Sequence, residues 1–166
     1  MPKKKPPILE TERFTLRQLQ EYDDQEIFAL RSSESVNRYI GRKPSQSIED
    51  ARAFIKTIHK NNSLYWVITM KGADQLIGTI SLFDFSADNL KAEIGYELLP
   101  EFQGRGIMQE ALSKVLEFSF QQLHLKLIEA CCNVENKSSI KLLAKLNFKT
   151  DLVCEGNLMM YKLTAH

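Results

Sequence analysis

The chain has 166 residues, of which 43% are apolar and 26% are charged, a length and composition that suit one compact domain with a continuous core. Lysine and arginine number 22 against 21 aspartates and glutamates, which gives a formal net charge of +1. This balance excludes bulk electrostatic attraction to nucleic acid or to an anionic membrane, so we expect neither as a direct partner. An anionic ligand would need a local site.

The three cysteines, Cys131, Cys132 and Cys154, lack C-x-x-C spacing, and the three histidines are scattered. We therefore expect no metal site, and free thiols favour a reducing, cytoplasmic location. Residues 1–8 contain three lysines but no apolar signal region, and no later apolar run is long enough to span a membrane. We predict a flexible basic arm over residues 1–8 and a single domain over residues 9–166.

In the first half of the chain, apolar periodicity and turn residues predict four strands and two helices. Ser47, three residues before Asp50, resembles a helix-capping arrangement. The last three strands follow one another through short turns, which predicts an antiparallel meander. The expected strands are residues 12–19, 64–70, 75–85 and 91–99, and the expected helices are residues 23–33 and 47–62.

The second half begins with the longest helical pattern, over residues 105–122, and continues with a strand, a helix and a terminal hairpin. The strand–helix–strand connection should be right-handed and locally parallel. This order predicts a mixed sheet with helices packed on it. The expected later elements are a strand at residues 127–133, a helix at residues 136–146 and a hairpin at residues 148–163.

Residues 98–108, Leu-Leu-Pro-Glu-Phe-Gln-Gly-Arg-Gly-Ile-Met, join the strand to this longest helix. The first N–H groups of a helix have no partner within it, and they lie at its positive end, where phosphate binds. Gly104 and Gly106 let the backbone approach a bulky anion, and Arg105 can add a charged contact. Gln109 stands where a dinucleotide fingerprint needs glycine, and the P-loop lysine is absent. Taken alone, the two glycines could also form a simple tight turn.

Four further blocks match one protein family in order and spacing. Residues 10–17 resemble an opening strand, residues 77–80 a hairpin, residues 92–98 the strand before the phosphate cradle, and residues 133–148 an asparagine-to-serine helix. Together with residues 98–108 they resemble the GNAT acetyltransferase superfamily, especially the RimJ/RimL-like branch of ribosomal-protein-alanine N-acetyltransferases. The resemblance covers nearly the whole chain.

Two positions depart from the family pattern. Glu101 stands where the broader superfamily prefers glutamine or arginine, although the branch accepts glutamate there. Asn147 replaces a helix-ending glycine, and asparagine is the next-best residue for a left-handed cap.

The resemblance implies an α/β (α+β) fold with a mixed, mostly antiparallel central sheet and helices on both faces. It also implies acetyl-CoA as co-substrate and no metal. In this family the pantetheine arm bonds to the strand's backbone and the pyrophosphate meets the N–H groups of the cradle. The coenzyme-binding residues implied are Leu98, Leu99, Gln103, Gly104, Arg105, Gly106, Ile107, Met108, Asn136 and Ser139.

Candidate catalytic residues lie on two elements. Asn136 is well placed to cap a helix with Ser139 at its third position. The resemblance adds that Ser139 hydrogen-bonds the departing thiolate, as a general acid or a relay, and Tyr161 is the alternative acid. Glu93 and Glu97 share a sheet face on a regular strand, and Glu93 is the candidate general base; a plain surface position is the other reading.

The implied function is acetyl transfer from acetyl-CoA to a primary amine by direct attack, with a ribosomal-protein-like N-terminal α-amine as first choice. An α-amine, with a pKa of about 7.7–8.0, needs less help from a base than lysine at about 10.4. Cys131 and Cys132 lie in a predicted buried strand, which argues against a covalent cysteine intermediate.

Two alternatives stay open: a small-molecule amine acceptor, such as a polyamine, amino acid or antibiotic, and a non-catalytic acyl-CoA-binding or protein-binding module. We expect a monomer or a homodimer. Arg38, Arg42 and Lys43 follow the first helix, where relatives shape the acceptor pocket, and they either attract an acidic substrate or are simply solvated.

Overall fold

The computed structural model describes residues 5–166, so the first four residues of the predicted basic arm lie outside the described part. The carbonyl of Pro6 accepts a hydrogen bond from Gln18 Nε2 at 3.2 Å, and that of Pro7 accepts one from Trp66 Nε1 at 2.9 Å. Pro6 is also buried. Pro6 and Pro7, which fall within the predicted arm, are therefore already packed against the domain.

Eight strands form a single sheet in the order β1-β2-β3-β4-β5-β6-β8-β7. Among the described residues, the neighbouring strands pair antiparallel except β5 and β6, which are parallel. The predicted mixed, mostly antiparallel sheet and its parallel crossover are confirmed. The strands are β1 Leu9–Glu10, β2 Phe14–Gln18, β3 Leu64–Met70, β4 Gly78–Phe83, β5 Lys91–Leu98, β6 Leu127–Asn133, β7 Lys149–Val153 and β8 Leu158–Thr164.

Among the described residues, five α-helices connect these strands, and side chains cap the starts of three of them, α2, α3 and α5. The hydroxyl of Ser47 accepts from the N–H of Asp50 at 3.3 Å, as its position in the sequence predicts. Asn147, with φ of 70°, adopts the left-handed conformation expected after the last helix. The helices are α1 Asp24–Ser32, α2 Glu34–Asn37, α3 Ile48–Lys60, α4 Ile107–Gln121 and α5 Lys137–Lys145, with 3₁₀ turns η1 at Glu21–Asp23 and η2 at Pro100–Phe102.

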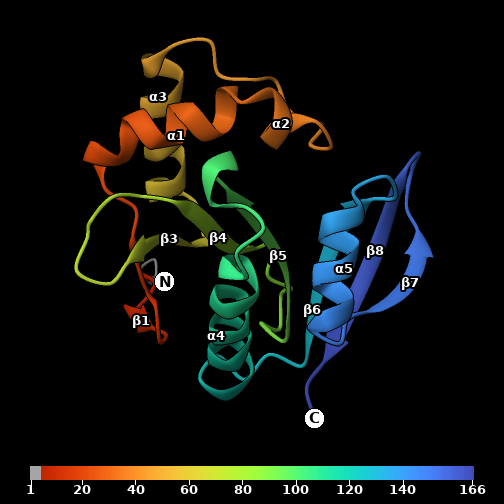
Figure 1. Ribbon diagram of the computed structural model, residues 1–166. Coiled ribbons are helices and arrows are strands. Elements are labelled where there is room, and N and C mark those ends of the chain that lie inside the picture. The colour runs from red at the N-terminus through yellow and green to blue at the C-terminus, as the bar shows by residue number, and fades with distance from the viewer. Residues whose placement is uncertain (1–4) are drawn as a thin grey trace.

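Alternation along β3 divides the core between the two faces of the sheet. Trp66 and Ile68 belong to one buried cluster, which residues of α4 and α5 complete. Tyr65 and Val67 point the other way, into a second cluster formed with α1 and α3. Helices therefore cover both faces, as expected, and Figure 1 shows α1 and α3 grouped away from α5.

Candidate functional site

The sheet opens between its two parallel strands. β5 and β6 pair only at Lys91 with Leu127, Ala92 with Ile128 and Glu93 with Glu129, although β5 continues to Leu98 and β6 to Asn133. Beyond this short ladder lies a cleft of about 1010 Å³, lined by both strands, the start of α4, α5 and the chain after α1. In Figure 1 the two strands part, with α4 and α5 on either side of the gap.

The open edge of β5 carries backbone groups that point into this cleft. The N–H of Leu99 donates to the carbonyl of Ile77 on the β4 side at 2.9 Å. Residues of an antiparallel strand alternate between bonding to their neighbour and pointing away from it. Tyr96 and Leu98 therefore direct their N–H and C=O groups away from β4, where β6 no longer pairs with them. An extended ligand can add here like a further strand.

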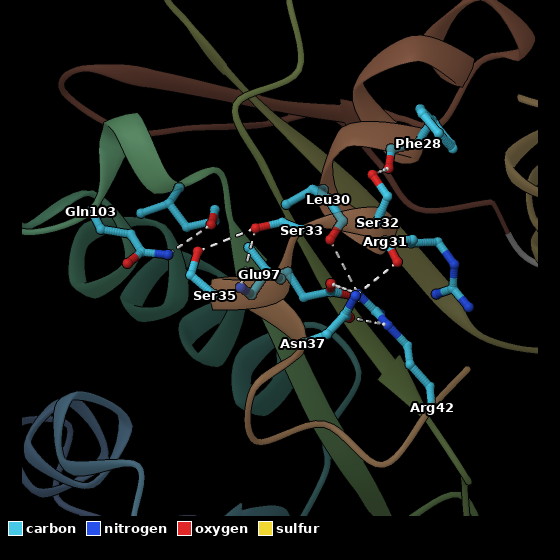
Figure 2. Close-up of polar contacts among 12 residues, drawn as sticks. Phe28, Leu30, Arg31, Ser32, Ser33, Ser35, Asn37, Arg42, Glu97 and Gln103 are labelled. Carbon is cyan, nitrogen blue, oxygen red and sulfur yellow. Dashed lines mark hydrogen bonds and ion pairs between the residues drawn. The ribbon is translucent and has the colours of Figure 1, made fainter. Parts of the chain in front are cut away.

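Leu99 and Gln103, two of the expected coenzyme contacts, have different surroundings. Both backbone groups of Leu99 are already used, because its N–H donates to Ile77 and its carbonyl accepts from Phe102 at 3.0 Å. Its side chain is buried in the cluster beneath α1 and α3. Gln103, in contrast, lines the cleft, and its Nε2 donates to the carbonyl of Leu98 at 3.0 Å (Figure 2).

The segment before α4 forms a cradle of free backbone donors. Gly104 and Gly106 have φ values of 78° and 73°, the left-handed region that glycine adopts without strain. Within residues 5–166, none of the N–H groups of residues 104–109 donates a hydrogen bond, and no side chain caps α4. A side chain added at Gly104 would meet no atom within 4 Å. These donors surround the positive end of a helix of 15 residues, which suits a phosphate group.

Arg105 lies at the outer side of the cradle and is absent from the residues that line the cleft. Its guanidinium lies 5.7 Å from the ring centre of Phe102, and its carbonyl accepts from Arg13 Nη1 at 3.2 Å. Arg13 also donates from Nε to Glu110 Oε1 at 2.7 Å, in the first turn of α4. The Arg13 contacts, which the sequence did not reveal, fix the cradle to β2.

Asn136 and Ser139 lie at the start of α5, and Ser139 contacts β5 across the cleft. Asn136 caps α5, because its Oδ1 accepts from the N–H of Ser139 at 3.2 Å. The hydroxyl of Ser139 lies 2.5 Å from that of Tyr96. Burial raises the pKa of Tyr96 to about 12, against a smaller opposite effect of the Ser139 hydrogen bond. Sequence reasoning missed Tyr96, although its even spacing from Ile94 and Leu98 places it on their face.

The cysteines near this contact are poor nucleophiles. Cys132 is buried, and burial raises the pKa of its thiol, while a hydrogen bond from Ser139 lowers it. Cys131 is exposed and lines the cleft, contrary to the expected buried position, but desolvation of its sulfur raises its pKa to about 11. Both remain thiols at neutral pH, which argues against a covalent intermediate. Tyr161 is buried in the core and does not line the cleft.

Glu93 and Glu97 share a sheet face, as expected, because the β4–β5 ladder runs without a bulge. Glu93 forms the last pair of the parallel ladder, opposite Glu129, and does not line the cleft. Burial, with the charges of Asp84 and Glu129, raises the pKa of Glu93. A raised pKa suits a general base, but this position gives Glu93 no contact with the cleft.

Glu97 lines the cleft but is bound on both oxygens by Arg42. Arg42 Nη1 donates to Oε2 at 2.8 Å and Nη2 to Oε1 at 2.5 Å (Figure 2). Nε of Arg42 donates to Asn37 Oδ1 at 2.7 Å, and Asn37 Nδ2 donates to the carbonyl of Arg31 at 2.8 Å. The side chains of Arg42 and Glu97 are each 16% exposed. This ion pair ties the chain after α1 to the strand that leads to the cradle.

The end of the cleft beside this ion pair has a polar, weakly cationic lining. Among the described residues, the carboxylates that line the cleft are Glu97, which Arg42 neutralises, and Glu135 in the loop before α5. Lys43 is exposed and does not line the cleft. The other residues of this end are Ser35, Val36, Arg38, Tyr39, Ile40, Tyr65, Thr79 and Ser81.

Within residues 5–166, no group of three or more histidine, cysteine, aspartate or glutamate side chains is placed to hold a metal ion. No helix of this part of the chain has the length and apolar character needed to cross a membrane.

Comparison with known proteins places the chain among acetyltransferases. A family model described as "Acetyltransferase (GNAT) domain" matches residues 13–149. The "Uncharacterized N-acetyltransferase YoaA" of Bacillus subtilis (strain 168) is 37% identical over 159 residues, which cover 93% of this chain and 88% of the relative.

Two solved structures show the same fold. Mycobacterium smegmatis RimJ in complex with CoA-disulfide has a TM-score of 0.84 at 20% identity, covering 96% of this chain and 88% of that one. Spermidine N-acetyltransferase from Vibrio cholerae, in complex with CoA and spermine, has a TM-score of 0.81 at 24% identity, covering 91% of this chain and 95% of that one.

Proposed function

The chain belongs to the GNAT acetyltransferase family and is an N-acetyltransferase, and from this premise we propose that it transfers the acetyl group of acetyl-CoA to a protein N-terminal α-amine by direct attack. The observation that carries this proposal is the alignment of three features along one cleft. They are the open edge of β5, the free N–H groups of residues 104–109 and the hydroxyl of Ser139.

The donor occupies the cleft from the cradle inward. Its pyrophosphate accepts hydrogen bonds from the N–H groups of the cradle, and Gly104 and Gly106 leave room for the phosphates. The amide groups of the pantetheine arm bond to the open backbone edge of Tyr96 and Leu98. Leu99 has no part in this binding, since its backbone groups are already bonded. Asn136 keeps the start of α5 in place beside the arm.

The chemistry requires a new N–C bond, cleavage of the C–S bond and transfer of one proton from nitrogen to sulfur. A backbone N–H at the open edge of β5 hydrogen-bonds the thioester oxygen as negative charge develops on it, an interaction worth about 3–4 kcal/mol in other enzymes. Ser139 donates a hydrogen bond to the departing thiolate. The proton released by the amine reaches the sulfur through water.

The acceptor is assigned from the charges at the end of the cleft beside the Arg42–Glu97 pair. A polyamine carries several positive charges and would require free carboxylates, whereas Glu97 is already paired and Arg38 adds a positive charge. Neither Glu93 nor Glu97 is placed to act as a free base. An α-amine with a pKa of about 7.7–8.0 is substantially neutral near pH 7.5 and needs no such base to lose its proton before attack.

The test follows release of free CoA thiol from acetyl-CoA with three acceptors: a peptide with a free α-amine, the same peptide N-formylated, and spermidine. We expect thiol release above background with the free peptide alone. Release with spermidine but not with the peptide would replace the acceptor by a small-molecule amine. Release with none of them, in a protein that binds CoA, would refute both acceptor assignments.

A further inference from the structure

Ser139 lies between two side chains that come from the two diverging strands. On one side is the phenol of Tyr96 on β5, 2.5 Å from the serine Oγ. On the other is the buried thiol of Cys132 on β6, whose pKa the serine hydroxyl lowers against the larger raising effect of burial. Cys132 Sγ itself points to the carbonyl of Asn133 at 3.4 Å. All four residues line the cleft.

The direction of hydrogen bonding between Tyr96 and Ser139 follows from acidity. A phenol is a stronger hydrogen-bond donor than an alkyl hydroxyl, and burial holds the pKa of Tyr96 at about 12, so that the phenol keeps its proton at physiological pH. Tyr96 therefore donates to Ser139. The serine proton is then free to point away from Tyr96.

We propose that Tyr96 is a positioning residue for Ser139: its hydrogen bond occupies a lone pair of the serine oxygen and so directs the serine proton toward the sulfur that leaves the acetyl group. This inference rests on the function proposed above. It adds Tyr96 to the proposed site. Tyr96 belongs to β5, the strand proposed to bind the donor, and reaches Ser139 across the cleft.

The reaction step balances without loss of a proton from either residue. The amine nitrogen bonds to the carbonyl carbon, and the electron pair of the C–S bond moves onto sulfur. Ser139 stabilises that thiolate by a hydrogen bond, which is strong because its acceptor is charged. An ordinary thiol has a pKa of about 8.5, so neither hydroxyl gives its proton to the sulfur. The thiolate takes the proton that nitrogen releases.

If Tyr96 had a purely structural role, Tyr96→Phe would have a different effect on turnover. Its ring packs against the main core cluster, so a packing role would be kept by phenylalanine. Tyr161 offers a matched control, because it is also a largely buried tyrosine of that cluster but lies outside the cleft on β8. Tyr161→Phe should leave turnover unchanged, since it removes a hydroxyl that has no contact with Ser139.

The experiment compares Tyr96→Phe, Ser139→Ala, the double variant and Tyr161→Phe in the full chain, with acetyl-CoA and the free α-amine peptide. We expect Tyr96→Phe to lower kcat about tenfold, the effect of one hydrogen bond in the transition state, with the KM for acetyl-CoA and the melting temperature nearly unchanged. The double variant should be no slower than Ser139→Ala, because Tyr96 acts through the serine.

Two outcomes overturn the inference. One is an unchanged kcat for Tyr96→Phe while Ser139→Ala is slow, which would leave the proposed function intact. The other is a double variant whose fold-decrease in kcat equals the product of the two single decreases, which would mean that Tyr96 acts independently of Ser139. Full activity of Ser139→Ala would instead refute the role of the serine in the proposed function.

Discussion

Arg42 binds both carboxylate oxygens of Glu97 across 55 residues of sequence, and each side chain is only 16% exposed. A bidentate guanidinium–carboxylate contact holds both groups in one orientation. It fixes the chain after α1, which lines the proposed acceptor end of the cleft, to the strand that leads into the cradle.

The first prediction concerns the stability that this ion pair provides. Arg42→Ala leaves Glu97 with an uncompensated charge in a partly buried site, so it should destabilise the fold by about 2 kcal/mol, less than the 3–5 kcal/mol of fully buried pairs. Arg52→Ala is the control, because Arg52 pairs with Asp24 at 2.9 Å but is 55% exposed, and should cost about 0–1 kcal/mol. Urea denaturation measures both. Equal effects would mean that the Arg42 pair is no stronger than a surface pair.

The second prediction separates the guanidinium from its charge. Arg42→Lys keeps the charge but loses the fork that bonds Glu97 and Asn37 together. We expect the KM for the peptide acceptor to rise about tenfold, because the acceptor end loses its fixed position, while the KM for acetyl-CoA changes little. Steady-state kinetics with each substrate varied in turn provides the check. A rise only in the KM for acetyl-CoA would contradict this role.

The third prediction compares two glycines of matched backbone geometry. Gly104 and Gly72 have φ values of 78° and 81°, and an added Cβ at either meets nothing within 4 Å. Alanine should therefore destabilise both sites by a similar amount, about 1–2 kcal/mol. Gly72 lies in the turn after β3, outside the cleft. Titration calorimetry should show weakened CoA binding for Gly104→Ala alone. Normal CoA affinity in that variant would remove the cradle from the site.

The fourth prediction uses the raised pKa of Glu93, which burial and the nearby charges of Asp84 and Glu129 produce. Because the pKa is higher in the folded than in the unfolded chain, the stability linked to its protonated form is present at low pH and lost as pH rises through the folded pKa. Glu93→Gln should therefore be more stable than the native chain at pH 7.5, and this difference should shrink toward pH 4.

Denaturation at the two pH values measures that difference, with Glu117→Gln as an exposed control. The turnover of Glu93→Gln should match that of the native chain, because Glu93 does not line the cleft. A large fall in kcat would restore Glu93 as the general base.

The strands that could be predicted are those whose bounds are set by local sequence. The expected bounds of β3 and β6 match the structure residue for residue, because each is a short, mainly apolar segment between polar turns. β1 was missed, since Leu9–Glu10 is too short to show any period and depends on pairing with β2. α2 was missed because four residues show no helical pattern; its start depends on Ser33, whose Oγ accepts from Val36 N at 3.3 Å.

The cradle was predictable because all its parts are adjacent in sequence. The contacts of Ser139 with Tyr96 and of Arg42 with Glu97 were not, since 43 and 55 residues separate the partners. Their meeting depends on how far β5 and β6 remain paired and on how the chain after α1 folds back. The even spacing of Glu93 and Glu97 placed both side chains on one face of β5. That spacing does not tell which end of β5 opens into the cleft.

The most direct test of α-amine acetylation uses a peptide that carries one free α-amine and one internal lysine. The peptide is incubated with the protein and acetyl-CoA at pH 7.5, and tandem mass spectrometry then locates the acetyl group. We expect acetylation of the α-nitrogen and not of the lysine, because neither Glu93 nor Glu97 is free to deprotonate an amine whose pKa is about 10.4. Acetylation of the lysine, or of neither nitrogen while the same sample acetylates spermidine, would contradict it.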